Sequence, residues 1–260
     1  MQIADPWQKA IATRHFVAKW REGTLAPSTH NSVLSDHPAR PERPELWSPG
    51  KMPKRRFGNS QGRASLIHAI AHIEMTAIDL ALDMTARFAE QVLAETGFDT
   101  CSQFITDWLR VADDEARHFN LLSKRLSAMG LAYGDLPAHS GLWDIATRTM
   151  DDVLARLALA PLVMEARGLD VTPGMIEKFR KHGDNANADA LSVIYEDEID
   201  HVAIGAKWFR LIAEKRGENP VAHFRDLVMN RFPGGLKPPF NHDARFKAGF
   251  GREFYENLCP

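Results

Sequence analysis

Two copies of the pattern Asp-Glu-x-x-His stand far apart in this chain, at residues 114–118 and 197–201. Residues i and i+3 of a helix lie on the same face, so the glutamate and the histidine of each copy can reach one metal ion together. The four residues concerned are Glu115, His118, Glu198 and His201. Their types and spacing therefore predict a metal site that draws on two helices.

Two further glutamates complete a regular order along the chain. Glu74 lies in HAIAHIEMTAIDLAL and Glu165 in LALAPLVMEARGLD, and each interrupts an apolar stripe of helical period. Glu115 and Glu198 interrupt similar stripes in their own segments. The set reads Glu, Glu-x-x-His, Glu, Glu-x-x-His, which is the ligand set of a two-metal carboxylate site inside a four-helix bundle.

The charge of this set also favours bound metal. Four carboxylates in an apolar core would repel one another, and some would have to take up protons, whereas two divalent cations would neutralise them. Mixed oxygen and imidazole ligands suit iron or manganese and do not exclude zinc, and iron is the metal we expect. The alternative is a set of structural ion pairs. Four interruptions of this kind, on four helices in this order, favour the metal.

Long helices are needed to position these side chains. We expect bundle helices at about 61–95, 102–129, 142–167 and 185–216, with a long connection at 130–143. Other helices are expected at about 6–22, 173–182 and 220–231, and from a loop at 232–243 to about 258. Six prolines between residues 24 and 60 predict an extended arm. The predicted parts are 1–60 (helix and arm packed on the bundle), 61–217 (bundle) and 218–260 (helical extension), in one structural domain overall.

The phrases that carry these residues resemble a known family. The chain looks like the bacterial family DUF455, within the ferritin-like di-iron carboxylate superfamily, over most of residues 5–258. The resemblance rests on the stretches HAIAHIEMTAIDLALD, DWLRVADDEARHF, YGDLPAHSGLWD, RLALAPLVMEARGLDVTPGM, IYEDEIDHVAIGAKWF and LKPPFNHDARFKAGF. It implies an all-α, ferritin-like four-helix bundle with a long crossover. It also implies that Glu115 and Glu198 lie between two metals, with Glu74 and Glu165 as terminal ligands and one histidine on each metal.

Five further residues lie close in sequence to the ligand set. The resemblance implies that Asp114 and Asp197 each accept a hydrogen bond from the ring of a metal-bound histidine on the facing helix, Asp114 from His201 and Asp197 from His118. The alternative is a solvated acid in an acidic stretch. Tyr195 lies three residues before Glu198 and could bond a ligand or carry electrons, although a buried tyrosine with a satisfied hydroxyl is the commoner case. His68 and His72 are expected to be core or supporting residues.

Composition and charge restrict the setting. Apolar residues make up 44% of the 260 residues and charged residues 25%, and the net charge of −2 gives no general support for binding nucleic acid. A basic cluster at Lys51, Lys54, Arg55, Arg56 and Arg63 is interpreted as a solvated part of the arm. Two distant cysteines, Cys101 and Cys259, suit a reducing compartment. With no signal peptide and no expected membrane span, we expect a cytoplasmic protein.

These observations predict an oxidoreductase with two metal ions that uses oxygen or peroxide to oxidise a small substrate, with an unknown electron donor. The alternatives are a non-catalytic iron-binding or storage protein and, by resemblance alone, a hydroxylase of modified tRNA. The amino-terminal arm and the extra helices favour a small homo-oligomer over a storage cage. We also expect a cleft that reaches the metals, bordered by the 130–143 connection or by the loop near His242.

Overall fold

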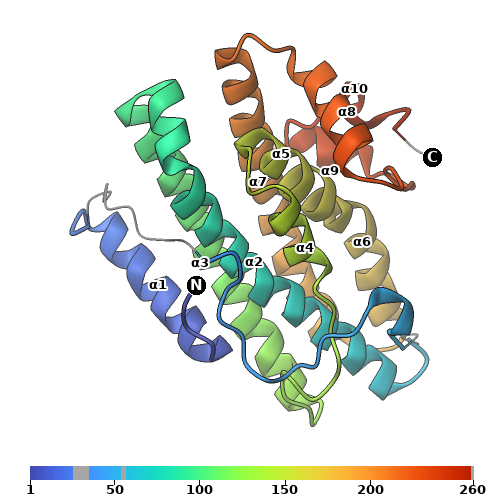
Figure 1. The fold of residues 1–260 in the computed structure, drawn as a ribbon. Coiled ribbons are helices and arrows are strands. Elements are labelled where there is room, and N and C mark those ends of the chain that lie inside the picture. The colour runs from blue at the N-terminus through green and yellow to red at the C-terminus, as the bar shows by residue number, and fades with distance from the viewer. Residues whose placement is uncertain (26–34, 54–56, 259–260) are drawn as a thin grey trace.

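A computed structural model describes residues 1–25, 35–53 and 57–258, and within these ranges it contains helices and no strand. The fold class is all-α, as predicted. The longest elements are α2 (Ser60–Thr96), α3 (Phe98–Ala128) and α7 (Asn185–Lys215). Figure 1 shows these helices side by side along most of the molecule. Helix α3 packs against both α2 and α7 and therefore lies between these two helices.

Helices α2 and α3 form a hairpin with almost no loop. Asn59 begins α2, because its side chain accepts a hydrogen bond from the Gly62 amide at 2.7 Å. Gly97 ends α2 and begins α3 with a φ of 87°, a backbone conformation that favours glycine. The predicted start of the second bundle helix at residue 102 was therefore late, because the single glycine makes the whole reversal.

The predicted single helix at 142–167 is wrong. The chain there forms α4 (Gly141–Arg148), α5 (Val153–Leu159) and a π-helical turn, η2 (Ala160–Glu165). Asp152 starts α5 anew by accepting hydrogen bonds from the amides of the first turn. Pro161 has no amide hydrogen to donate within the helix, and the wider turn occurs at this residue.

The predicted separate helix at 173–182 is also wrong, because α6 (Ala166–Lys181) runs straight through Pro173. A proline inside a helix leaves the carbonyl four residues earlier without its usual donor. That carbonyl belongs to Leu169, and the side-chain Nδ2 of Asn241 donates to it at 3.1 Å. A distant loop therefore provides the hydrogen bond that the proline cannot.

The carboxy-terminal segment lies across one end of α5 and α7 (Figure 1). It contains α8 (Pro220–Arg231), α9 (His242–Lys247) and α10 (Arg252–Tyr255). The predicted single last helix is thus two short ones. Gly249, with a φ of 68°, lies between α9 and α10. Arg245 anchors α9 to α6 through a buried ion pair with Asp170 at 2.7 Å.

At the amino end, α1 (Pro6–Arg21) packs mainly on α3. Asp5 caps it by accepting from the Gln8 amide at 2.8 Å, as predicted. Lys9 of α1 forms a buried ion pair with Asp79 of α2. The described part of the arm contains only one short 3-10 turn, η1 (Pro49–Lys51). Of the residues weighed from the sequence, Lys54, Arg55, Arg56 and Cys259 lie outside the described residues.

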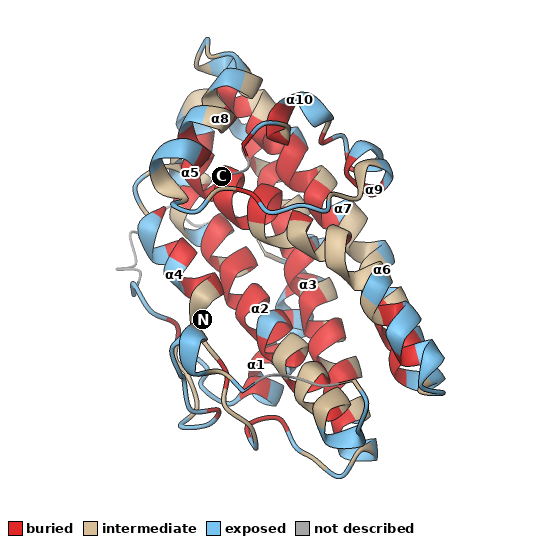
Figure 2. Ribbon diagram, turned by 90° about the vertical axis from the view of Figure 1, so that its right-hand side faces the viewer, coloured by how far each residue is buried: buried red, intermediate tan, exposed pale blue. Residues whose placement is uncertain are grey.

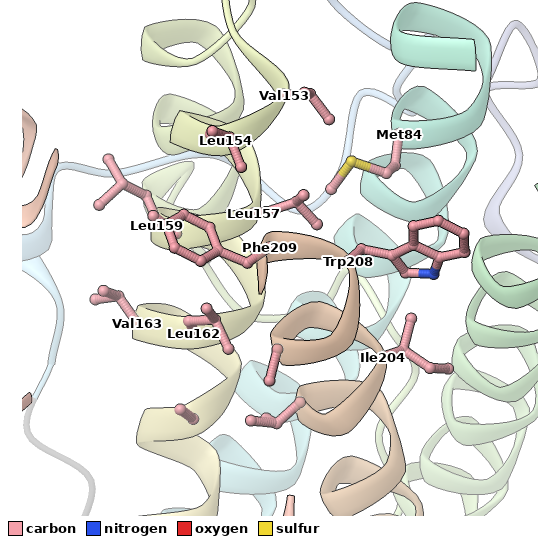
Figure 3. Close-up of a cluster of buried hydrophobic side chains, with 14 of the residues drawn as sticks. Met84, Val153, Leu154, Leu157, Leu159, Leu162, Val163, Ile204, Trp208 and Phe209 are labelled. Carbon is pink, nitrogen blue, oxygen red and sulfur yellow. The ribbon is translucent and has the colours of Figure 1, made fainter. Parts of the chain in front are cut away.

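Buried side chains line the faces where the helices meet (Figure 2). The largest cluster extends from α2 and α3 to the carboxy-terminal helices, and between α5, η2 and α7 it includes Leu157, Leu162 and Phe209 (Figure 3). By length and composition α2 could cross a membrane, contrary to the expectation from the sequence. However, 67% of its most apolar window is buried inside the protein, and this burial accounts for its apolar character.

Candidate metal centre

The structure gathers the predicted glutamates and histidines from four different elements. Glu74 comes from α2, Glu115 and His118 from α3, Glu165 from η2, and Glu198 and His201 from α7. Ligand atoms of four of them, Glu74, Glu115, His118 and Glu198, all lie within 4.8 Å of one another. This buried group of carboxylates and imidazole could hold a metal ion.

Each histidine turns its Nδ1 atom toward the carboxylates. His118 Nδ1 lies 3.1 Å from Glu74 Oε2 and 3.6 Å from Glu115 Oε2. His201 Nδ1 lies 3.2 Å from Glu115 Oε1 and 3.7 Å from Glu198 Oε1. Glu115 therefore faces both imidazoles, one with each oxygen. This is the place that a carboxylate bridging two metals would occupy.

The opposite nitrogen of each ring meets an aspartate of the facing helix. His118 Nε2 lies 2.9 Å from Asp197 Oδ2, and His201 Nε2 lies 3.5 Å from Asp114 Oδ2. These are the pairings expected from the sequence. Such a contact fixes the orientation of the ring and directs its Nδ1 toward the carboxylates, where a metal could replace the proton on that nitrogen.

Arg117, which was not among the residues predicted from the sequence, joins the two aspartates. Its Nη2 donates to Asp114 Oδ1 at 2.9 Å and to Asp197 Oδ2 at 2.8 Å. Arg117 of α3 thus connects the two aspartates, one on α3 and one on α7, that contact the histidine rings. In the sequence it is a charged residue within an acidic stretch, and its position between Glu115 and His118 was the only available signal.

Glu165 is the last residue of the π-helical turn, and it is not one of the four residues whose ligand atoms lie within 4.8 Å of one another. The turn packs tightly on α7, because a Cβ atom placed on Gly205 would lie 2.6 Å from Pro161 Cβ. Real side chains do not approach this closely, so Gly205 permits the close contact. One extra residue per turn redirects the side chains that follow it, and such turns occur often at functional sites.

Electrostatic interactions connect Glu165 with Glu198, Glu115 and His201. Burial raises its pKa well above the usual value, and the neighbouring carboxylates of Glu198 and Glu115 raise it further. Burial also raises the pKa of Glu74, again reinforced by Glu115. Both carboxyl groups therefore hold a proton more tightly than an exposed glutamate does when no cation is present.

For His118, His201 and Glu115, contacts with neighbouring charged groups outweigh the effect of burial on the pKa. Burial alone would lower the pKa values of His118 and His201, but contacts with carboxylates raise both well above the usual value. Burial would raise the pKa of Glu115, but both imidazoles hold it below its ordinary range. In Asp197, the hydrogen bond with His118 is the main cause that lowers the pKa to about 2.

Several donor atoms at the centre have no hydrogen-bond partner. Among the described residues, Glu115 Oε2, Glu165 Oε2 and His201 Nδ1 are buried and unpaired. A buried polar atom without a partner is costly, and each of these atoms is a good metal donor. The residues present thus fit a metal centre, with glutamate oxygens and imidazole nitrogens as donors.

Other weighed residues lie away from this cluster or are occupied elsewhere. The Tyr195 hydroxyl accepts from Asn241 Nδ2 at 3.0 Å, so it has a partner in the carboxy-terminal segment. His72 contacts the Tyr133 hydroxyl at 2.9 Å, and His68 accepts from the Gly134 amide. The cavity beside His242, of about 620 Å³, contains none of the six residues. A cleft that reaches the centre stays a prediction.

A model of a protein family described as a protein of unknown function (DUF455) matches residues 2–256. The chain belongs to the DUF455 family. An uncharacterized protein of Haemophilus influenzae is 43% identical over 212 residues, which cover 82% of this chain and 73% of the relative. No solved structure matches. The DUF455 match therefore confirms the family resemblance seen in the sequence and leaves function to the geometry of the site.

Proposed function

We propose that this DUF455 protein is a ferritin-like di-metal carboxylate protein, most readily a di-iron oxidoreductase that uses oxygen or peroxide to oxidise a small substrate. In this proposal α2, α3, the α5–η2–α6 segment and α7 are the four helices of the bundle. The ligands are Glu74, Glu115, His118, Glu165, Glu198 and His201. The mixed carboxylate and imidazole donors suit iron or manganese and do not exclude zinc, and iron is the metal that we propose.

One observation carries the proposal. Glu74, Glu115, His118 and Glu198 place ligand atoms within 4.8 Å of one another in a buried cluster, and both histidines have their second nitrogen held by an aspartate. Ion pairs satisfy part of this cluster, because His201 Nδ1 lies 3.2 Å from Glu115 Oε1, but the buried Glu165 Oε2 has no hydrogen-bond partner. A proton could neutralise Glu165, but it would not give this oxygen a partner.

The chain's own residues have separable roles in this proposal. Glu115 is placed between the two histidines to bridge, while Glu74 and Glu165 supply one terminal carboxylate each. Asp114 and Asp197 orient the rings, and the apolar packing of η2 against α7 excludes water from that side. When bound, a pair of iron ions would supply the redox chemistry that these side chains cannot.

The centre is nearest to solvent on the side of α3 and α7. Side-chain exposure there rises from 14% at Glu198 to 18% at Asp114 and 31% at Asp197. An external electron donor, a small-molecule substrate and a small homo-oligomer in the cytoplasm complete the proposal. We propose no contact with nucleic acid or membrane.

Oxygen uptake tests the proposal. Full-length protein is loaded with iron(II) without oxygen, mixed with oxygenated buffer, and followed with an oxygen electrode and by absorbance. We expect fast uptake that stops after about one turnover per site when no donor or substrate is supplied. Glu115→Gln should abolish the uptake, whereas Glu90→Gln, an exposed residue of α2, should not.

Assembly size and iron capacity separate this enzyme from a storage protein. Size-exclusion chromatography with light scattering should show a small oligomer that takes up two irons per site. A large hollow assembly that accumulates many irons per chain would overturn the oxidoreductase in favour of storage. If wild type consumes oxygen slowly and the Glu115→Gln variant does so at the same rate, the proposed metal centre would be overturned.

A further inference from the structure

A second cavity lies on another face of α2, between this helix and the arm. Its volume is about 250 Å³. The arm contributes Arg40, Pro41, Pro44 and Leu46, and His72, Met75 and Tyr133 form the side toward the protein body. No ligand of the candidate metal centre lines it. His72 lies two positions before Glu74, so the two side chains point to different faces of α2.

Arg40 is the cationic residue of this cavity. It makes no hydrogen bond or ion pair with any residue that the structure describes, and its Nη1 atom is buried. A buried guanidinium N–H without an acceptor is costly. The segments 26–34 and 54–56 contain no acidic residue that could neutralise it. Among the described residues, none accepts from Arg40 Nη1, so this N–H is free to donate to a bound ligand.

The nearby carboxylates are engaged elsewhere or lie at the rim. Asp79 is held by the buried Lys9, so these two charges cancel and Arg40 keeps a net positive charge. One oxygen of Asp79, Oδ1, has no hydrogen bond, and still no ion pair with Arg40 forms. Glu42 and Glu45 line the cavity but are exposed, and Glu45 accepts from Trp47 Nε1.

His72 is a second polar group of the cavity wall. It is only 5% exposed, its Nδ1 lies 2.9 Å from the Tyr133 hydroxyl, and its Nε2 is buried without a hydrogen-bond partner. The backbone carbonyl of His139 lies near this ring but not in hydrogen-bond geometry. If Tyr133 donates its hydroxyl proton to Nδ1, Nε2 carries the ring proton and is a second donor.

We propose that this cavity binds a small organic monocarboxylate. Its carboxylate accepts from Arg40, with His72 as a neighbouring donor, and its short aliphatic or aromatic part lies against Pro41, Pro44, Leu46 and Met75. A single guanidinium suits one negative charge, and the acidic rim formed by Glu42 and Glu45 disfavours dianions such as phosphate. The ligand would also join the arm to α2.

Isothermal titration calorimetry tests this site on the full-length protein, with and without bound metal. The probes are butyrate and benzoate, each compared with its neutral amide and with inorganic phosphate. We expect saturable binding of one carboxylate per chain, weak or no binding of the amides and of phosphate, and no dependence on metal. Loss of a charge-assisted hydrogen bond in Arg40→Gln should weaken carboxylate binding roughly tenfold or more.

The matched control is Arg43→Gln, an exposed arginine of the same arm that does not line the cavity. On unmodified protein, the methyl resonance of Met75 should shift during the titration, whereas that of the exposed Met229 should not. The proposal is overturned if wild type shows no saturable binding, if amides or phosphate bind as well as carboxylates, or if Arg40→Gln binds as tightly as Arg43→Gln.

Discussion

When the metal-free protein binds metal, it should release the protons that the ligand side chains hold. Burial and neighbouring carboxylates raise the pKa values of Glu74 and Glu165, so both carboxyl groups hold a proton more tightly than exposed ones do. Carboxylate contacts raise the pKa values of His118 and His201, so both rings hold their second proton more tightly than exposed imidazoles do. A metal needs these ligands deprotonated, and it must displace the protons that they hold.

The expected magnitude follows from these four groups. Filling the centre must remove the protons that these groups hold, at most one from each. Each proton released makes the overall binding free energy more favourable by about 1.4 kcal/mol per pH unit. The sign is fixed: higher pH favours metal, and acidification expels it.

Calorimetry in buffers of different ionisation enthalpy measures the proton count. Zinc is the metal of choice, because it undergoes no redox chemistry and accepts the same donors. Glu165→Gln should lower the released number by about one proton, and Glu90→Gln should leave it unchanged. Release of no proton, or an affinity that does not change between pH 6 and pH 8, would refute the assigned protonation states.

Three further predictions concern an aspartate beside the histidines, the contact between η2 and α7, and the effect of pH on stability. Asp197→Asn should keep the fold but weaken metal retention on the order of 10–100-fold in a chelator competition, whereas Asp200→Asn, an exposed neighbour, should not. Gly205→Ala forces a Cβ against Pro161 and should lower stability in urea by roughly 1–3 kcal/mol and reduce metal content; an unchanged variant would contradict the tight contact. The melting temperature of the metal-free protein should fall as pH rises above 4.5 and further above 6.5, because the raised pKa values mean that the native state binds more protons than the unfolded chain. A rising melting temperature over this range would contradict that sign.

The gathering of glutamates and histidines could be predicted from the sequence because it rests on local helix geometry. The spacing in Glu115-x-x-His118 places both side chains on one face whatever the helix packs against. Glu74 and Glu165 were recognisable because each is a charge within an apolar stripe. The contacts of Arg117 were not predictable, since its partner Asp197 lies 80 positions away.

The errors in helix boundaries have a common cause. The sequence indicates a break at Pro173, but Asn241 completes the hydrogen bonding of α6 from a distant loop. It indicates one helix over 142–167, but the chain changes direction where Asp152 starts α5. Propensity describes the local preference of the chain, and tertiary contacts overrode it at these positions.

The central claim is that the Glu–His cluster holds two metal ions. Metal analysis by mass spectrometry, on full-length protein purified from its native host without added metal, tests it most directly. We predict two metal ions per chain, predominantly iron, with nearly all of this content lost in Glu115→Gln and kept in Glu90→Gln. No stoichiometric metal in the wild-type protein, or equal metal in Glu115→Gln, would contradict the account.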